Sequence, residues 1–275
     1  MAKIDKRNLS KAEARKLILQ RRQEKQKQII VPQNSLNSAD YNIVCLKHGR
    51  KYSADYVNKL YYGCRINSNK DFKFFCITED PKDLDKNIIA LPLPKTNLQG
   101  WWFKPYIFSN ELPVKNIILY LDLDVVITGP IDKLFEFAPK HFSICRDFNR
   151  IINPNYTKFN SSVMKFEHGM LDHLWKKFKQ SSHLIMRRYH GDQDFIFAEQ
   201  QGIAEYFPDQ WIKSWKWEIR KSRKFEMNGR RGYKKLATIE DVTPPEDCCI
   251  AVFHGDPNPH LCDDPYIKET WVYKE

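Results

Sequence analysis

From residue 41 onward the sequence repeats one pattern, in which short apolar runs alternate with segments typical of helices. The apolar runs span residues 41–46, 72–77, 88–93 and 116–121. Between them, Tyr56, Leu60 and Tyr61 share one face of a predicted helix over 54–64, and a second helix is predicted over 102–108. Strands this short and this apolar are typical of a parallel sheet that is buried on both faces. The pattern therefore predicts an α/β fold with a mostly parallel central sheet and helices on both faces.

Polar residues follow several of these runs, and this position makes them candidates for a binding site. In open parallel sheets, ligands bind beyond the carboxyl ends of the strands. Lys47 and Thr78 follow the first two runs, and Asp147 follows a later apolar run at 142–145. We expect these side chains to gather at one edge of the sheet.

Residues 117–127 contain the most informative of these positions. This segment is otherwise apolar, and its two charged residues are Asp122 and Asp124. Burying an unpaired carboxylate is costly, so a pair at the end of a buried strand requires compensation. A divalent cation with oxygen ligands, Mn²⁺ or Mg²⁺, would supply it. On this feature alone, two solvated carboxylates at a strand-to-loop corner remain an alternative.

Five motifs in order give a more specific indication. They are the basic residue Lys104, the Asp-Leu-Asp segment 122–124, the Phe-Asn-Ser segment 159–161, the Asp-Gln-Asp segment 192–194 and the His-Gly segment 254–255. Together they resemble the motifs of GT-A glycosyltransferases, in particular the group around glycogenin and the bacterial lipopolysaccharide galactosyltransferases. The resemblance covers about residues 41–272. It implies a GT-A, Rossmann-like fold and a metal-dependent transfer of a hexose from a nucleotide sugar, with UDP favoured, to a glycan or other hydroxyl acceptor.

The resemblance also implies roles for individual residues. Asp122, Asp124 and His254 would hold the metal, and Asp192 and Gln193 would be catalytic. The residues expected to contact the donor are Leu46, Lys47, Thr78, Lys104, Tyr120, Leu123, Asp147, Asn160, Ser161 and Gly255. Asp194 and Trp215 are the expected acceptor contacts, although Asp194 could instead cap a helix and Trp215 could instead pack in the core.

Two points of chemistry stay open at this stage. The resemblance implies retention of configuration, with Gln193 near the anomeric carbon, but Asp192 could also be read as the acceptor base of an inverting enzyme. Relatives usually carry a basic residue where this chain has Asn258. The diphosphate contact is then missing, or it comes from Lys213, Arg220 or another residue.

The net charge of +11 suggests a nucleic-acid-binding protein, but residues 1–40 alone carry +6 of it. Residues 8–30 predict a basic helix with Ser10 as its cap, followed by a linker to residue 40. We expect this extension to dock a partner or mediate oligomerisation, with contact to RNA or an acidic membrane as the alternative. Residues 41–275 form the predicted catalytic domain. A second basic stretch at 220–235 has no counterpart in the resemblance.

Other classes explain the sequence less well. A nucleic-acid-binding protein does not account for two carboxylates that close an apolar strand. A metal-dependent nucleotide-sugar hydrolase or nucleotidyltransferase shares the metal and the nucleotide, and it is the main alternative. No apolar run approaches the roughly 20 residues of a membrane helix. Seven scattered cysteines indicate reduced thiols, and we expect a cytoplasmic protein.

Overall fold

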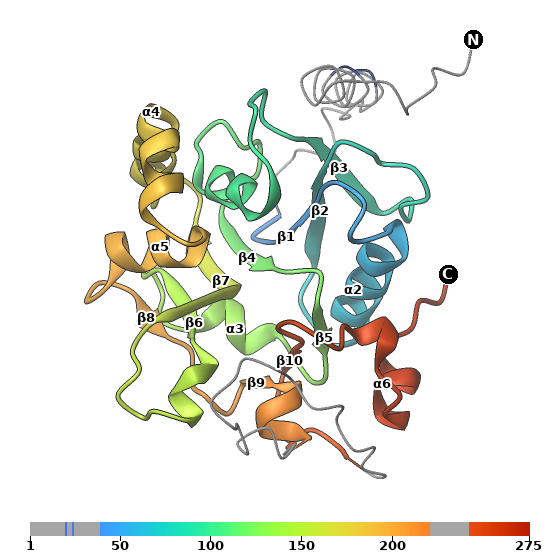
Figure 1. The fold of residues 1–275 in the computed structure, drawn as a ribbon. Coiled ribbons are helices and arrows are strands. Elements are labelled where there is room, and N and C mark those ends of the chain that lie inside the picture. The colour runs from blue at the N-terminus through green and yellow to red at the C-terminus, as the bar shows by residue number, and fades with distance from the viewer. Residues whose placement is uncertain (1–19, 21–23, 25–38, 221–241) are drawn as a thin grey trace, which may run out of the picture.

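A computed structural model describes residues 39–220 and 242–275, together with Gln20 and Glu24. Within these residues seven strands form a central sheet in the order β3-β2-β1-β4-β7-β6-β8 (Figure 1). The strands are β1 (Tyr41–Lys47), β2 (Phe72–Thr78), β3 (Ile88–Pro92), β4 (Ile117–Leu121), β6 (Ser143–Arg146), β7 (Phe159–Glu167) and β8 (Glu205–Tyr206). All pairings are parallel except those of β7, which runs antiparallel to β4 and β6. The predicted α/β fold with a mostly parallel sheet is confirmed.

The sheet is buried on both faces, as the apolar runs predict. Along β1, Ile43 and Cys45 join one core cluster, while Val44 and Leu46 join the other. This alternation follows from the two-residue period of a strand. The helices on the two sides are α2 (Ala54–Ile66) with the first cluster, and the 3₁₀ helix η3 (Gly100–Phe108), α4 (Asp172–Arg188) and α5 (Asp192–Gln200) with the second (Figure 1).

A smaller sheet brings the C-terminal part of the chain to the end of β4. Its strands are β5 (Val125–Ile127), β10 (Ile250–Val252) and β9 (Ile212–Ser214), in that order. Next to the β5–β10 pairing, the amide of Phe253 donates to the carbonyl of Asp124 at 2.9 Å. The short elements around it are α3 (Asp132–Glu136), η4 (Phe148–Ile151), the π-helix η5 (Trp215–Ile219), η6 (Pro259–Leu261) and α6 (Pro265–Thr270). His254 therefore begins its loop beside the predicted metal carboxylates.

Most predicted elements occur within one or two residues of their expected bounds, and one differs in type. The segment predicted as a helix over 102–108 is the 3₁₀ helix η3, which contains Pro105. Proline lacks the amide hydrogen that an α-helix interior needs, and its ring clashes with the preceding turn. The segment instead forms 3₁₀ turns, which are common in short connecting pieces of this kind.

The remaining predictions about the chain are tested only in part. The predicted helix over 8–30, apart from Gln20 and Glu24, and residues 221–235 of the basic stretch lie outside the described residues. All seven cysteines are buried and free of disulfide bonds. No helix in the described ranges is long and apolar enough to cross a membrane.

Trp215 is the residue that joins the smaller sheet to the C-terminal helix α6. Its indole is fully buried and stacks on Phe253 at 5.6 Å and on Tyr266 at 6.0 Å between ring centroids. The indole Nε1 donates to Asp264 Oδ2 at 2.8 Å. A large ring in such surroundings contributes strongly to stability, because its removal leaves a cavity and takes one hydrogen bond from the buried carboxylate of Asp264.

We expect Trp215→Ala to lower the free energy of unfolding by about 3–5 kcal/mol in urea denaturation. Trp215→Phe should lose less, because the ring stacking is kept while the bond to Asp264 is lost. Ile203→Ala is the matched control, because Ile203 is an exposed apolar residue and its truncation should change stability by about 0.5 kcal/mol or less. A loss below about 1 kcal/mol in Trp215→Ala would contradict this role of the indole.

Candidate active site at the end of strand β4

A buried lysine joins three distant segments just beyond the carboxyl end of β4. Lys104 Nζ lies 3.0 Å from both oxygens of Asp122 and 3.3 Å from Asp192 Oδ2. It also donates to Ser161 Oγ at 2.9 Å, and Ser161 Oγ in turn donates to Asp192 Oδ2 at 2.7 Å. The four residues come from η3, the end of β4, β7 and the first turn of α5. We call them the Lys104 cluster.

The electrostatics of the cluster keep its lysine charged. Burial alone lowers the pKa of Lys104, but the charges of Asp122 and Asp192 outweigh it and raise this pKa above its usual value. Burial raises the pKa of Asp192, and attraction to Lys104 opposes that shift. Breaking a buried ion pair from one side costs about 3–5 kcal/mol, because the remaining charge is left without compensation. The cluster is therefore a fixed, preorganised arrangement of charge.

The strand end itself is held in place by local bonds. The amide of Asp122 donates to the carbonyl of Ser162 at 2.9 Å, which continues the β4–β7 pairing by one residue. The hydroxyl of Tyr120 donates to Asp122 Oδ1 at 2.8 Å, although Tyr120 is itself buried in the strand. Tyr120 therefore orients Asp122 from within the core.

Asp124 is a second carboxylate beside this cluster, and its charge is poorly compensated. Its Oδ2 accepts a hydrogen bond from the neutral hydroxyl of Tyr52 at 2.9 Å. Burial, together with repulsion from Asp122, raises the pKa of Asp124 to about 6. The charge of Asp122 raises the pKa of Asp124 because two neighbouring carboxylates repel each other. Their oxygen atoms are the ligands that Mn²⁺ or Mg²⁺ prefers. The carboxylate pair fits the predicted cation.

His254, the predicted third ligand, has its ring in a different set of contacts. The imidazole stacks on Phe148 with ring centroids 5.0 Å apart and an interplanar angle of 13°, and its Nε2 lies 2.7 Å from Ser214 Oγ. Among the described residues, no group of three or more His, Cys, Asp or Glu side chains gathers closely enough to hold a metal ion. His254 is near Asp124 through the main chain, and its role as a ligand stays a prediction.

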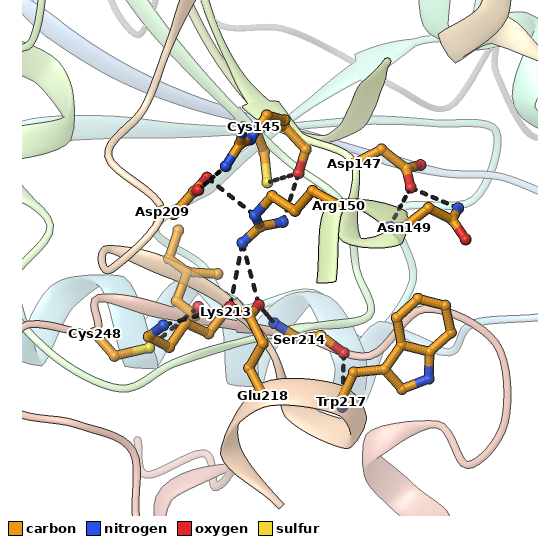
Figure 2. Close-up of polar contacts among 12 residues, drawn as sticks. Cys145, Asp147, Asn149, Arg150, Asp209, Lys213, Ser214, Trp217, Glu218 and Cys248 are labelled. Carbon is orange, nitrogen blue, oxygen red and sulfur yellow. Dashed lines mark hydrogen bonds and ion pairs between the residues drawn. The ribbon is translucent and has the colours of Figure 1, made fainter. Parts of the chain in front are cut away.

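A buried polar network supports Ser214 and, through it, His254. Figure 2 shows the guanidinium of Arg150 between Asp209 and Glu218, at 3.1 Å and 3.2 Å respectively. Glu218 Oε2 accepts from the amide of Ser214 at 2.9 Å, so the position of Ser214 depends on this ion pair. Such outer contacts commonly fix the orientation of a functional imidazole.

The side chain of Lys216 lies inside the loop that follows β10. Lys216 Nζ donates to the carbonyls of His254 and Asp256, the latter at 2.7 Å. Gly255 between them has a φ of +73°, and a Cβ at that position would lie 3.5 Å from Lys216 Nζ. Burial lowers the pKa of Lys216 to about 8, and attraction from Asp256 and Asp124 opposes the shift. Lys216 thus supports the loop from inside.

Lys216 bears on the missing basic residue at position 258. Of the two replacements suggested by the sequence, Lys213 pairs with Glu218 at 3.4 Å and Arg220 pairs with Asp264 at 3.3 Å. Lys216 is therefore the basic residue whose side chain contacts the His-Gly loop. Sequence reasoning missed it because its neighbours Trp215 and Trp217 drew attention to stacking, and its distance from residue 254 in the chain gives no local signal.

The other predicted site residues are divided between this edge and local structural roles. Lys47 Nζ donates to the carbonyl of Asp80. Lys47 and Thr78 are neighbours in the strand register, at the carboxyl ends of β1 and β2. Asp147 caps η4 by accepting from the amide of Asn149 at 2.8 Å (Figure 2). Asn160 is buried, and its Oδ1 accepts from the amide of Ser162 at 3.1 Å.

Leu46 is buried near the end of β1, and Leu123 is buried in the turn between β4 and β5. Gln193 is half-buried in the first turn of α5. Asp194 lies in the same turn and pairs with Lys158 at 3.2 Å. The structure therefore places the predicted donor and catalytic residues along one edge of the sheet.

One sequence-based expectation is corrected. Trp215 was expected to contact the acceptor, but its indole is fully buried in the packing described above. It cannot stack on a ligand in this position. The core-packing alternative named from the sequence therefore describes this residue.

The raised pKa of Asp124 gives a test that needs no substrate. An unfolded Asp ionises near pH 3.8, whereas the pKa of the folded Asp124 is raised to about 6. Between these pH values the folded protein keeps a proton that the unfolded chain releases, so stability falls as pH rises and the full penalty is present above about pH 6. In EDTA we expect Asp124→Asn to be about 1–3 kcal/mol more stable than the parent at pH 8, with the difference shrinking towards pH 4. Urea denaturation across this range measures it, and a variant that is less stable at pH 8 would contradict the assignment.

Comparisons with known proteins agree with this architecture. No family model matches the sequence, and no curated protein sequence matches it. Among solved structures, the chain is similar to the galactosyltransferase LgtC in complex with donor and acceptor sugar analogues, with a TM-score of 0.58 and 13% identity over 85% of this chain and 97% of that one. An active-site mutant of LgtC, in which a glutamine is replaced by glutamate, gives a TM-score of 0.56 at 13% identity over 83% of this chain and 93% of that one.

A second protein shows the same likeness. The glycosyltransferase GlyE of Streptococcus pneumoniae TIGR4 gives a TM-score of 0.57 and 12% identity, over 84% of this chain and 60% of that one. At such low identity the likeness concerns the fold. The chain therefore has the GT-A fold of these glycosyltransferases.

Proposed function

We propose that this protein is a glycosyltransferase that moves a hexose from a nucleotide sugar, with a UDP-sugar as the favoured donor, to an acceptor hydroxyl. The observation that carries the proposal is the Lys104 cluster with Asp124 beside it, at the carboxyl end of β4. In open α/β sheets this edge is where ligands bind. The similar fold of LgtC was solved with donor and acceptor sugar analogues bound, which supports the same class of ligands here.

Asp122 and Asp124 are the residues that would hold a divalent cation, with His254 as the candidate third ligand. A bound Mn²⁺ or Mg²⁺ would neutralise the charge that develops on the departing diphosphate. Ser214 Oγ contacts Nε2 of the imidazole, so we expect ligation by His254 to use Nδ1 or to replace the Ser214 contact. The carboxylates alone supply oxygen donors of the right kind.

Two lysines of the chain would bind or position the diphosphate. Lys104 is held by Asp122 and Asp192, so it needs little reorganisation when negative charge develops nearby. Lys216 holds the carbonyls of His254 and Asp256, and Gly255 between them lets the main chain approach a ligand without a side chain. We assign Lys104 to donor binding and Lys216 to the shape of the loop.

The transfer itself breaks the bond between the sugar C1 and the diphosphate oxygen and forms a bond from C1 to the acceptor oxygen. The diphosphate leaves with the bonding electrons, and its departing oxygen takes up the proton that the acceptor hydroxyl releases. Asp192 is buried, and its Oδ2 is shared by Lys104 and Ser161. We therefore assign Asp192 to positioning and not to proton abstraction, which favours retention of configuration over inversion.

Gln193, next to Asp192, is the residue that we assign to the transferred sugar. It is half-buried, whereas Asp192 is buried. The active site of LgtC contains a glutamine whose replacement by glutamate has been studied as a structure, which supports this choice. An amide can donate and accept hydrogen bonds, and both are needed to orient sugar hydroxyls.

Binding of the nucleotide is the first prediction of this proposal. We expect calorimetry to show UDP binding that depends on Mn²⁺. We expect Asp122→Asn to weaken this binding at least about tenfold, because a charged metal-binding carboxylate worth roughly 1.4 kcal/mol or more is lost. Asp71→Asn is the matched control, because Asp71 is exposed before β2, at the opposite edge of the sheet. Equal UDP binding with and without Mn²⁺, or unchanged binding in Asp122→Asn, would contradict the assigned donor site.

Turnover is the second prediction. A set of nucleotide sugars is incubated with Mn²⁺ and simple glycans, and released nucleoside diphosphate is measured. We expect release from at least one donor, with an acceptor-dependent increase that identifies transfer. Release that no acceptor increases, without any glycoside product, would favour a nucleotide-sugar hydrolase instead.

A further inference from the structure

Two consecutive tryptophans at the start of η3 have opposite surroundings. Trp102 packs into the core and stacks on Phe178, with ring centroids 5.7 Å apart and an interplanar angle of 11°. Trp101 keeps 51% of its surface exposed. Trp102 and the buried residues that follow it in η3 anchor this helix against the core and α4, so packing of the helix does not account for the exposed indole of Trp101.

The geometry of η3 places Trp101 beside the Lys104 cluster. In a 3₁₀ helix the side chains at positions i and i+3 eclipse one another, and three residues rise by about 6 Å. Trp101 and Lys104 have this spacing, so they share one face of η3. Lys104 reaches Asp122 and Asp192 from that face. Trp101 therefore lies one turn away from the buried charges, on the side that is open to solvent.

The start of α5 holds the indole from its edge. A Cβ on Gly191 would lie 3.5 Å from Nε1 of Trp101, so the bare main chain at this position packs closely against the ring. The ring of His190 is nearly parallel to the indole, with 15° between planes and 6.4 Å between centroids. Gly191 directly precedes Asp192 and Gln193. The exposed indole thus packs two residues before Gln193, the residue that we assign to the transferred sugar.

We propose that Trp101 is the platform on which a sugar ring of the acceptor glycan stacks. This inference rests on the proposed function. A pyranose ring has a face of C–H groups that packs on an aromatic ring, while its hydroxyls stay available to polar groups at the rim, and tryptophan offers the largest such surface. The ring of His190 stacks beside one face of the indole, and the first turn of α5, which carries Asp192, Gln193 and Asp194, follows Gly191 at the edge of the indole.

The position of Trp101 favours a sugar over the base of the nucleotide. Its close contacts are at the start of α5, which packs on β7. The candidate nucleotide residues Lys47 and Thr78 end β1 and β2, and β4 separates β1 from β7 in the sheet. The transferred sugar would lie between these two regions, which leaves the Trp101 side for the acceptor.

The test measures glycan binding directly with Trp101→Ala, Trp101→Phe and the control Ile203→Ala. Ile203 keeps 66% of its surface exposed and lies just beyond the other end of α5. Saturation-transfer NMR titrations use cellobiose, maltose and lactose as probes. We expect the parent to bind at least one of them, Trp101→Ala to bind it about tenfold more weakly, and Trp101→Phe to fall between, because stacking on a ring contributes roughly 0.5–1.5 kcal/mol beyond the buried area. Ile203→Ala should bind like the parent.

Calorimetry with UDP and Mn²⁺ on the same proteins separates this inference from the proposed function. We expect UDP affinity in Trp101→Ala to stay within about twofold of the parent, which corresponds to roughly 0.4 kcal/mol. The platform is overturned if the parent binds none of the three disaccharides, if Trp101→Ala binds them unchanged, or if that variant loses UDP binding instead. Disaccharide binding that depends on Trp101 in a protein without UDP binding would keep the platform and remove the proposed donor.

Discussion

The site depends on one buried ammonium group shared by two carboxylates. Lys104 on η3 contacts Asp122 at the end of β4 and Asp192 at the start of α5, with Ser161 of β7 bridging. Removing three charges from water is costly, and the cost is offset only if all partners meet with good geometry. The packing of η3 and α5 on the sheet therefore determines whether this arrangement of charge exists. The chemistry of the site thus depends on the packing of the core.

A second half of the site comes from the C-terminal part of the chain. The β5–β10 pairing brings the loop 254–256 beside Asp124, Lys216 supports that loop from inside, and the Arg150–Glu218 pair places Ser214 against His254. The two halves differ in character. The Lys104 cluster is held by ion pairs within the main sheet, whereas the loop is held by main-chain carbonyls and an outer network. A cation bound at Asp122 and Asp124 would join them.

The sequence predicts the sheet and the carboxylates well, because both depend on local patterns. Buried strands appear as short apolar runs, and two charges at the end of such a run are visible without a structure. The partners of these charges are not visible, since the pairing of Lys104 with Asp192 and the support of the loop by Lys216 arise from contacts between segments far apart in the chain. Proline in η3 could have indicated a 3₁₀ helix. The burial of Trp215 was one of two alternatives at the level of sequence, and the exposure of Trp101 could not be predicted, because neighbouring aromatic residues give no periodic signal in such short segments.

We propose that the carboxylates at the end of β4 bind a divalent cation together with a nucleoside diphosphate. The most direct measurement is diffraction from crystals grown with Mn²⁺ and UDP, with anomalous scattering used to locate the metal. We expect one strong Mn²⁺ peak, at an ion that Asp122 and Asp124 coordinate. The UDP phosphates should contact this ion and lie near Lys104. Crystals in which UDP is bound with no Mn²⁺ at these carboxylates, or in which both bind elsewhere, would contradict it.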